Sequence, residues 1–378
     1  MSVTEDFSDF EAYSNETRAW LFWLDKAIED VAIALLTPDF IISLIGVFLN
    51  VFHLIILTRK SMRNTSTNVL MIGIGFCDLF IMLFSTYSTV LNFLHPVYEC
   101  WAPSGYPRLI VDLFASALRD DFRRVSAWLG VLMATIRFLI IKTSLNPKYE
   151  GLSRPSLGWK IILALFILSS FVSAAYWARI EVVETTPWVP GEQCTGFPAN
   201  FSETQYGLVM NGQYDSTLLY LKIFLLTEGM LKIIPAVLLP ILAFLLIREL
   251  NKTTDVRRKI TVGQKIETPK KDHTTNLVIL MTVTFMVAEG PLGTIYFAQG
   301  FLTTKPGFLA MSTNMATVMG IFVSLNATTH CLICLTMSSQ YRNCVRTVFC
   351  CQVKPKKITV SVSPKTSVTS VRNVVVEV

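Results

Sequence analysis

The stretch LLYLKIFLLTEGMLKIIPAVLLPILAFLLI, Leu218–Ile247, decides the class of fold. A bilayer core about 30 Å thick is crossed by a helix of about 20 mostly apolar residues, and this run is long enough. It is too long for a β-barrel strand, so it predicts a membrane-spanning helix. The composition agrees, because 52% of the 378 residues are hydrophobic and 16% are charged, against about 25% charged in soluble domains. Soluble, disordered and fibrous proteins are therefore excluded.

Further apolar runs of this kind bring the number of predicted spans to seven. They are Ile33–Leu57, Asn68–Leu94, Leu109–Ile141, Lys160–Trp177, Leu218–Ile247, Asn276–Ala298 and Phe308–Leu335. The third is the least regular, because many charged residues precede its clean apolar part. The sequence thus predicts an all-α membrane protein, a seven-helix bundle over residues 33–337. A short amphipathic helix over 338–351 and a disordered tail over 352–378 are expected to follow.

The lysine and arginine residues predict how this bundle is oriented. Most of the 33 lie after the first, third, fifth and seventh spans, and such residues stay on the cytoplasmic side. We therefore expect residues 1–32 to be extracellular and the C-terminus to be cytoplasmic in the plasma membrane. The basic residues that give the net charge of +6 are then explained by the cytoplasmic face of the membrane protein. Nucleic acid is therefore excluded as a partner. Asn15 and Asn200 stand in glycosylation sequons on the predicted outer side, in agreement.

The eight cysteines divide by compartment. Only Cys100 and Cys194 fall on the predicted oxidising side. A single external pair is most simply one disulfide, which would tie the long loop after the fourth span to the bundle. Cys350 and Cys351 lie beside basic residues near the inner membrane face, so they are candidate palmitoylation sites, with unmodified thiols as the alternative.

Several polar residues lie within the predicted spans. A charge at mid-bilayer costs roughly 2.5–3.5 kcal/mol on insertion scales, so each one needs a reason. Asn50, Asp78, Ser126 and Asn326 could hydrate a small cation or form a network that switches between states. The alternative is a static cluster that only joins helices. Arg137, at the inner edge of the third span, could switch with them or merely reach phosphate headgroups.

A second group of charged residues lies in the outer halves of the spans. Spacings of seven and four place Asp112, Arg119 and Arg123 on one face of the third helix. Charges from three helices describe a water-filled ligand pocket, and internal ion pairing is the alternative. Pro235 and Pro291 interrupt the fifth and sixth helices, where a helix can pivot. The pocket residues from those two helices are Glu228, Lys232 and Glu289.

Three motifs carry a family resemblance. They are Met133-Ala134-Thr135-Ile136-Arg137, Glu289-Gly290-Pro291-Leu292-Gly293 and Met337-Ser338-Ser339-Gln340-Tyr341-Arg342. With seven spans, they resemble a rhodopsin-like G protein-coupled receptor. More narrowly, they resemble the nematode serpentine receptor class W family, relatives of FMRFamide-type receptors. The resemblance covers about Ile33 to Cys351.

The resemblance implies a receptor for a neuropeptide or chemosensory cue that activates a heterotrimeric G protein. Arg137 would meet the G protein. Asp78, Ser126 and Asn326 would match a sodium site, with the sodium ion as an allosteric modulator and no other cofactor. The external cysteine pair would match the outer disulfide of the family. The full set of switch residues would be Arg137, Asn50, Asp78, Ser126, Pro235, Pro291, Asn326 and His330.

The sequence departs from the family pattern in places that concern the ligand and the switch. Ile136 replaces the acid that normally pairs with the arginine, and Ala327 and His330 replace a proline and a tyrosine of the seventh helix. Glu289 stands where a tryptophan is typical, and Arg119 where amine receptors keep an aspartate. These departures argue against a biogenic amine and favour a peptide or another ligand with charged or amide groups.

Other functions and partners remain to be weighed. A transporter or channel for a small polar solute is the alternative, although the odd span count and the lack of an internal repeat argue against it. The sequence has no nucleophile-elbow, zincin or phosphate-loop motif, so an enzyme is not predicted. Phosphorylated serines and threonines of the tail could recruit arrestin. The terminal Val376-Glu377-Val378 could add a strand to a PDZ-domain protein.

Overall fold

The computed structural model describes most of the chain. The described residues are 10, 13–94, 100, 104–143, 146–191, 194–198, 200–260 and 273–349. Three features expected from the sequence fall outside them: Cys350, Cys351 and the tail over 352–378.

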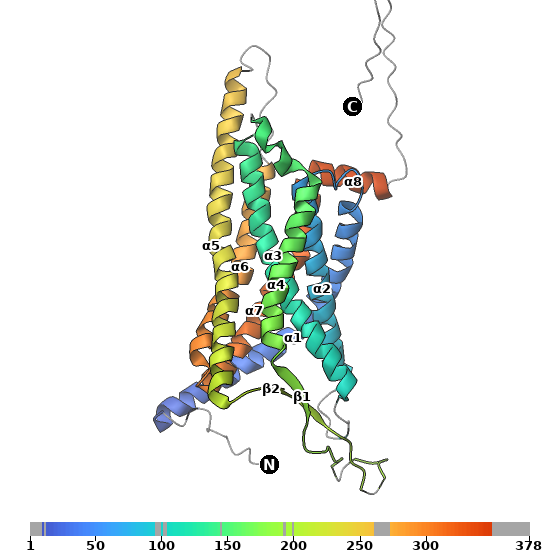
Figure 1. The fold of residues 1–378 in the computed structure, drawn as a ribbon, viewed down its shortest axis with the longest axis vertical. Helices are drawn as coiled ribbons and strands as arrows, with labels where there is room; N and C mark the ends of the chain where they lie inside the picture. The colour runs from blue at the N-terminus through green and yellow to red at the C-terminus, as the bar shows by residue number, and fades with distance from the viewer. Residues whose placement is uncertain are drawn as a thin grey trace, which may run out of the picture.

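Seven long helices form the bundle in Figure 1. Each of them is long and apolar enough to cross a membrane, so the predicted seven-helix fold is confirmed. The seven are α1 (Asn15–Leu57), α2 (Ser66–Leu94), α3 (Tyr106–Lys142), α4 (Pro155–Trp177), α5 (Tyr214–Ile260), α6 (His273–Leu302) and α7 (Pro306–Met337).

Short elements mark the two ends of the bundle. The strands β1 (Ile180–Glu184) and β2 (Tyr206–Met210) pair antiparallel between α4 and α5. The helix α8 (Ser339–Phe349) follows α7, and the 3₁₀ turn η2 (Pro147–Ser153) precedes α4. The strands and α8 lie at opposite ends of the bundle (Figure 1). We call these the hairpin end and the α8 end.

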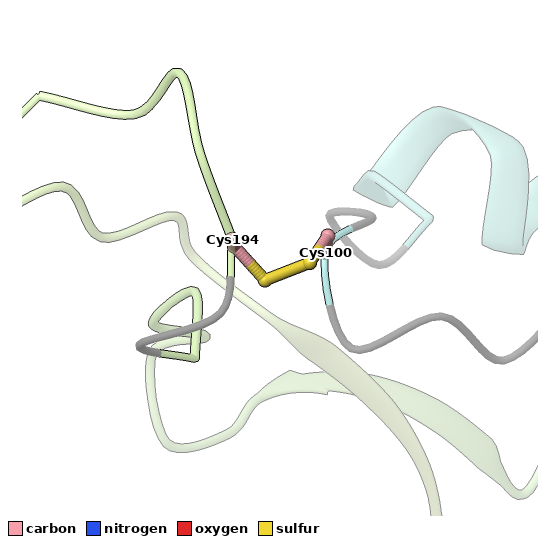
Figure 2. Close-up of a disulfide and its surroundings, with 2 residues drawn as sticks. All are labelled: Cys100 and Cys194. Atoms are coloured by element: carbon pink, nitrogen blue, oxygen red, sulfur yellow. A yellow bond between two sulfur atoms is a disulfide. The ribbon is translucent and has the colours of Figure 1, made fainter.

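The disulfide predicted from the external cysteine pair is present at the hairpin end. Cys100, in the connection between α2 and α3, is bonded to Cys194, in the connection between β1 and β2. Their Cα atoms are 5.2 Å apart. Figure 2 shows the sulfur–sulfur bond joining the two backbone segments. The long segment after α4 is thereby held against the start of α3.

The first helix begins earlier than the apolar run predicts, at Asn15 instead of Ile33. The Ser14 side chain caps it by accepting a hydrogen bond from a backbone N–H of the first turn. The added turns carry charges, yet one face is apolar: Leu21 is buried against Met311 of α7. In Figure 1 this part of α1 lies obliquely across the hairpin end. The first turns of α1 are amphipathic, so a continuous apolar run does not reveal them in the sequence.

The helices α5 and α6 pack tightly against each other at two glycines. A Cβ atom placed on Gly229 of α5 would lie 2.5 Å from the backbone nitrogen of Phe297 in α6. One on Gly300 of α6 would lie 2.6 Å from Leu226 of α5. Small residues allow this contact, which is a common way of packing helices within a membrane.

The short helix α8 confirms the amphipathic helix expected after the seventh span. Tyr341 and Cys344 are buried, whereas Arg346 is exposed. The Tyr341 hydroxyl lies 3.0 Å from Nδ1 of His53 in α1. Burial raises the pKa of this hydroxyl, so it stays protonated and available as a hydrogen-bond donor. The amide of Gln340 also donates to a backbone carbonyl of the α1–α2 turn, so α8 is docked on α1.

Candidate functional site

Four buried charged residues form a network between α3 and α5. The Arg124 guanidinium is paired with one carboxylate oxygen of Glu228. Lys232 Nζ lies 2.9 Å from the other oxygen, Oε2. Asp121 Oδ1 is 3.7 Å from Arg124 Nη2. These four side chains belong to residues only 2–4% exposed, and two acids balance two bases.

The fourth helix joins this network through serine side chains. Arg124 Nε donates to the hydroxyl of Ser169 at 3.0 Å, and Nη2 donates to its carbonyl and to the hydroxyl of Ser173. The Ser170 hydroxyl donates to Asp121 Oδ2 at 2.8 Å. A buried charge is tolerated when it is paired and hydrogen-bonded. The network therefore joins α3, α4 and α5.

The sequence reasoning missed two members of this network, Asp121 and Arg124. Arg124 lies next to Arg123, one helical step away from the face chosen by the spacing of seven and four. The spacing shows which residues share a face, but not which face turns toward α5. The available signal was the charge itself, since an arginine in an apolar span is costly on any face. The alternative weighed above, internal ion pairing, holds for Glu228. Both of its carboxylate oxygens are paired with cations of the chain.

Arg123 differs from the network, because two of its guanidinium nitrogens have bonding capacity left over. Arg123 Nε and Nη2 are buried and have no hydrogen-bond partner among the described residues. Glu289 of α6 is 5% exposed and close enough to Arg123 to interact with it electrostatically. Tyr296 of α6 also lies near this arginine, and its ring is 5.2 Å from the Lys232 ammonium. The structure thus gathers Arg123, Lys232 and Glu289 where α3, α5 and α6 meet.

The other two pocket candidates lie toward α2 instead. Asp112 accepts a hydrogen bond of 2.9 Å from the Tyr87 hydroxyl. Arg119 pairs with the neighbouring Asp120 at 3.1 Å, and its guanidinium lies 4.8 Å from the ring centre of Phe84. These two residues share a helix with Arg123 but make their contacts with a different neighbour.

The predicted polar cluster is assembled around Asp78 of α2. The Ser126 hydroxyl, on α3, donates to Asp78 Oδ1 at 3.1 Å. Nδ1 of His330, on α7, lies 2.7 Å from Asp78 Oδ2. The three residues join α2, α3 and α7 in the interior of the bundle.

The two asparagines bond differently from each other. Asn50 Nδ2 donates to the backbone carbonyls of Gly46 at 3.0 Å and Ala327 at 3.3 Å, which links α1 to α7. Asn326 Oδ1 is buried without a hydrogen-bond partner in the described part of the chain. Asn50 therefore links two helices through its amide nitrogen, while its Oδ1, like that of Asn326, has no hydrogen-bond partner among the described residues.

Arg137 lies at the α8 end and borders a cavity. The cavity has a volume of about 60 Å³. It is lined by apolar side chains together with Ser126, Arg137, Thr282, Asn326 and His330. Arg137 Nη2 is 3.6 Å from the sulfur of Met71. It forms no ion pair with any acid in the described ranges, as expected from the isoleucine that precedes it. The cavity thus connects the polar cluster with the end that carries α8.

The two prolines lie within the helices that carry the charged residues. Pro235 is inside α5 and Pro291 is inside α6, two residues after Glu289. A proline removes one backbone hydrogen bond from a helix, which weakens it at that turn. Each helix is therefore weakened close to the charged contacts described above.

Asn15 and Asn200, the two sequon asparagines that the sequence predicts to be outside, both lie at the hairpin end. Asn15 begins α1 and is exposed. Asn200 is exposed in the segment between the two strands and has a φ of 64°. Both positions are accessible to an enzyme acting on that end of the bundle.

Comparisons with known proteins give a consistent set of matches. The family model described as "Serpentine type 7TM GPCR chemoreceptor Srw" matches residues 37–352. The G-protein coupled receptor dmsr-1 of Caenorhabditis elegans is 20% identical over 350 residues, which is 82% of this chain and 66% of that receptor. The chain therefore spans slightly less than two thirds of the length of dmsr-1.

Visual pigments are also similar along most of their length. Rhodopsin of Lethenteron camtschaticum is 22% identical over 323 residues, 85% of this chain and 82% of the pigment. The green-sensitive opsin of Gallus gallus is 24% identical over 314 residues, 82% and 78% of the two chains. Each of these matches covers more than four fifths of this chain.

Proposed function

Because this chain belongs to the Srw family of serpentine seven-transmembrane G protein-coupled chemoreceptors, we propose that a peptide or chemosensory cue binds it between α3, α5 and α6. Membership makes it a multi-pass membrane protein and a receptor that couples to a G protein. A transporter is not favoured by this membership. The proposals below concern the class of ligand, the orientation of the bundle in the membrane, and the residues that bind the ligand and couple to the G protein.

The observation that carries the proposed site is the unused bonding capacity of Arg123. Two of its guanidinium nitrogens are buried without a partner among the described residues, and a buried unsatisfied donor is costly. A carboxylate or an amide carbonyl of a ligand would satisfy them. Glu289, close by on α6, would accept a hydrogen bond from an amide or a basic group of the same ligand. A peptide carries both kinds of group, and this supports a peptide over an apolar ligand.

The position of these two residues suggests how binding would reach the G protein. A ligand that bridges Arg123 of α3 and Glu289 of α6 favours one packing of these helices over another, which is a population shift between two states. Pro291 lies within the same helix as Glu289 and weakens it at that turn. We expect α5 and α6 to open around Arg137 at the α8 end, where the G protein would bind.

This mechanism implies an orientation. We propose that the hairpin end is extracellular and the α8 end cytoplasmic. The sequons at Asn15 and Asn200 and the Cys100–Cys194 disulfide all lie at the hairpin end, in support of this proposal. If a glycosidase applied to intact cells leaves both asparagines fully glycosylated, or if neither carries a glycan, this support is lost.

The cytoplasmic proposals concern residues beyond the described ranges. Palmitoylation at Cys350 or Cys351 would anchor the chain just after α8. Phosphorylation of the tail over 352–378 would recruit arrestin, and its last residues would bind a PDZ-domain protein. Removing the tail would then abolish capture of both partners while leaving ligand-driven G protein activation in place.

The test of the proposed site uses cells that express the full chain with a promiscuous G protein. A library of synthetic peptides, each in free-acid and amidated form, is screened by calcium release to find an agonist. Arg123→Ala should then raise the half-maximal concentration by about ten- to a hundredfold, because a charged hydrogen bond is worth about 1.5–3 kcal/mol. Glu289→Gln should also raise it.

A matched control separates this effect from a general change of charge. Arg179 is exposed at the hairpin end, next to β1. Arg179→Ala removes the same charge outside the proposed site and should leave the half-maximal concentration unchanged. Equal dose–response curves for the wild type, Arg123→Ala and Glu289→Gln would remove both residues from the ligand site.

A further inference from the structure

Asp78 has a partner from within the chain at each of its carboxylate oxygens. Ser126 Oγ donates to Oδ1 at 3.1 Å, and His330 Nδ1 lies 2.7 Å from Oδ2. An ionised carboxylate only accepts hydrogen bonds, and the imidazole tautomer that carries its proton on Nδ1 can donate one to it. Asp78 is 3% exposed and His330 is 8% exposed. The bond is therefore shielded from solvent.

The family resemblance implies a sodium ion on this aspartate, and the residues around it do not fit one. Hard cations are bound by several oxygen ligands at short distance, whereas imidazole suits transition metals. Here the position beside Oδ2 holds an imidazole nitrogen, at 2.7 Å, in place of an oxygen ligand. Among the described residues, the side-chain amide oxygens of Asn50 and Asn326 are buried without a hydrogen-bond partner, but neither restores the carboxylate oxygen that His330 already engages. Within the described residues, no cluster of three or more His, Cys, Asp or Glu could hold a metal.

We propose that His330 takes the place of the sodium ion: it satisfies Asp78 from within the chain, and this receptor does not bind sodium as an allosteric modulator. The link between α2 and α7 is then part of the polypeptide and cannot dissociate into solution. His330 stands where the family pattern has a tyrosine. The exchange of this one side chain accounts for the difference between a receptor that binds sodium at this aspartate and one that does not.

The surroundings of His330 support a role in changing state. His330 lines the cavity of about 60 Å³ that reaches Arg137 and also holds Ser126 and Asn326 in its wall. A movement that separates α7 from α2 at this level would break the His330–Asp78 bond, where a sodium-binding receptor would release an ion. The proposal concerns this bond and does not depend on the ligand site near Arg123.

The test is the thermal unfolding of the purified full-length receptor in detergent, in sodium chloride and in N-methylglucamine chloride at equal ionic strength. The wild type should unfold at the same temperature in both salts. In His330→Tyr, Asp78 Oδ2 is free for a cation, so sodium should raise the unfolding temperature by roughly 2 °C or more. His330→Asn, which also frees this oxygen, should respond in the same direction.

Two control variants make the result specific. His53 is a second buried histidine, but it contacts Tyr341 and not Asp78, so His53→Ala should remain insensitive to sodium. Asp78→Asn combined with His330→Tyr should lose the sodium effect. A sodium-specific rise in the wild type that disappears in Asp78→Asn would overturn the proposal. An absence of any sodium effect in both His330 variants would overturn it as well.

Discussion

Glu228 holds the buried charge network together, because its two carboxylate oxygens face two different cations. Arg124 pairs with one oxygen and Lys232 with the other, at 2.9 Å. Without this acid, two positive side chains would lie close together in an apolar interior with only Asp121 nearby. Removing one partner of a buried ion pair costs more than exchanging the whole pair for apolar residues.

We therefore predict that Glu228→Ala lowers the free energy of unfolding by about 3–5 kcal/mol. The measurement is thermal unfolding of the purified receptor in detergent. Glu184→Ala is the matched control: Glu184 is exposed at the end of β1, and its loss should change stability by less than about 0.5 kcal/mol. Equal unfolding temperatures for Glu228→Ala and Glu184→Ala would show that the network does not support the fold.

The sequence predicts such contacts only where they are local. Glu228 and Lys232 are four residues apart on one helix, so their pairing follows from helix geometry. The pairing of Arg124 with α4 and α5 and the bond between Asp78 and His330 join residues far apart in the chain. These depend on how the helices are rotated about their axes, which the packing of the whole bundle sets.

At the scale of elements, α5 and α6 form the contact that the proposed mechanism must alter. Gly229 allows the backbone of α5 to lie against Phe297 of α6. Both helices carry a proline, and each carries an acid of the site. A side chain at Gly229 would push the helices apart at this point.

We predict that Gly229→Ala destabilises the receptor by about 1–3 kcal/mol, because the new Cβ would lie 2.5 Å from a backbone nitrogen. Gly320→Ala is the control, since Gly320 lies inside α7 and an added Cβ meets nothing within 4 Å. This control should unfold at or above the temperature of the wild type. If the two alanine variants unfold alike, α5 and α6 do not pack as described.

The elements themselves could be predicted to different degrees. Apolar runs sufficed for seven helices, because a span needs length and low charge. The early start of α1 was not predicted, since its first turns are amphipathic and pack on Met311 of α7. The strands β1 and β2 were not predicted either. Their segment was expected only to be a long loop, and their pairing is a contact outside the membrane-spanning pattern.

At the scale of the whole molecule, the two proposed sites lie at different levels along the bundle. The proposed ligand residues Arg123 and Glu289 lie where α3, α5 and α6 meet, and Arg137 lies on α3 at the α8 end beside a cavity. Asp78 and His330 lie in the interior and join α2 to α7. A change in helix packing started by a ligand can therefore reach the G protein surface through helices that both sites share.

The most direct test of this coupling is guanine-nucleotide exchange on a G protein, driven by an agonist from the peptide screen. It is measured in membranes that hold equal amounts of wild type, Arg137→Ala or Arg59→Ala. Arg59 is exposed in the turn after α1 at the α8 end, which makes Arg59→Ala the matched control. Agonist-driven exchange should be lost in Arg137→Ala and retained in Arg59→Ala. Undiminished exchange in Arg137→Ala would contradict the account.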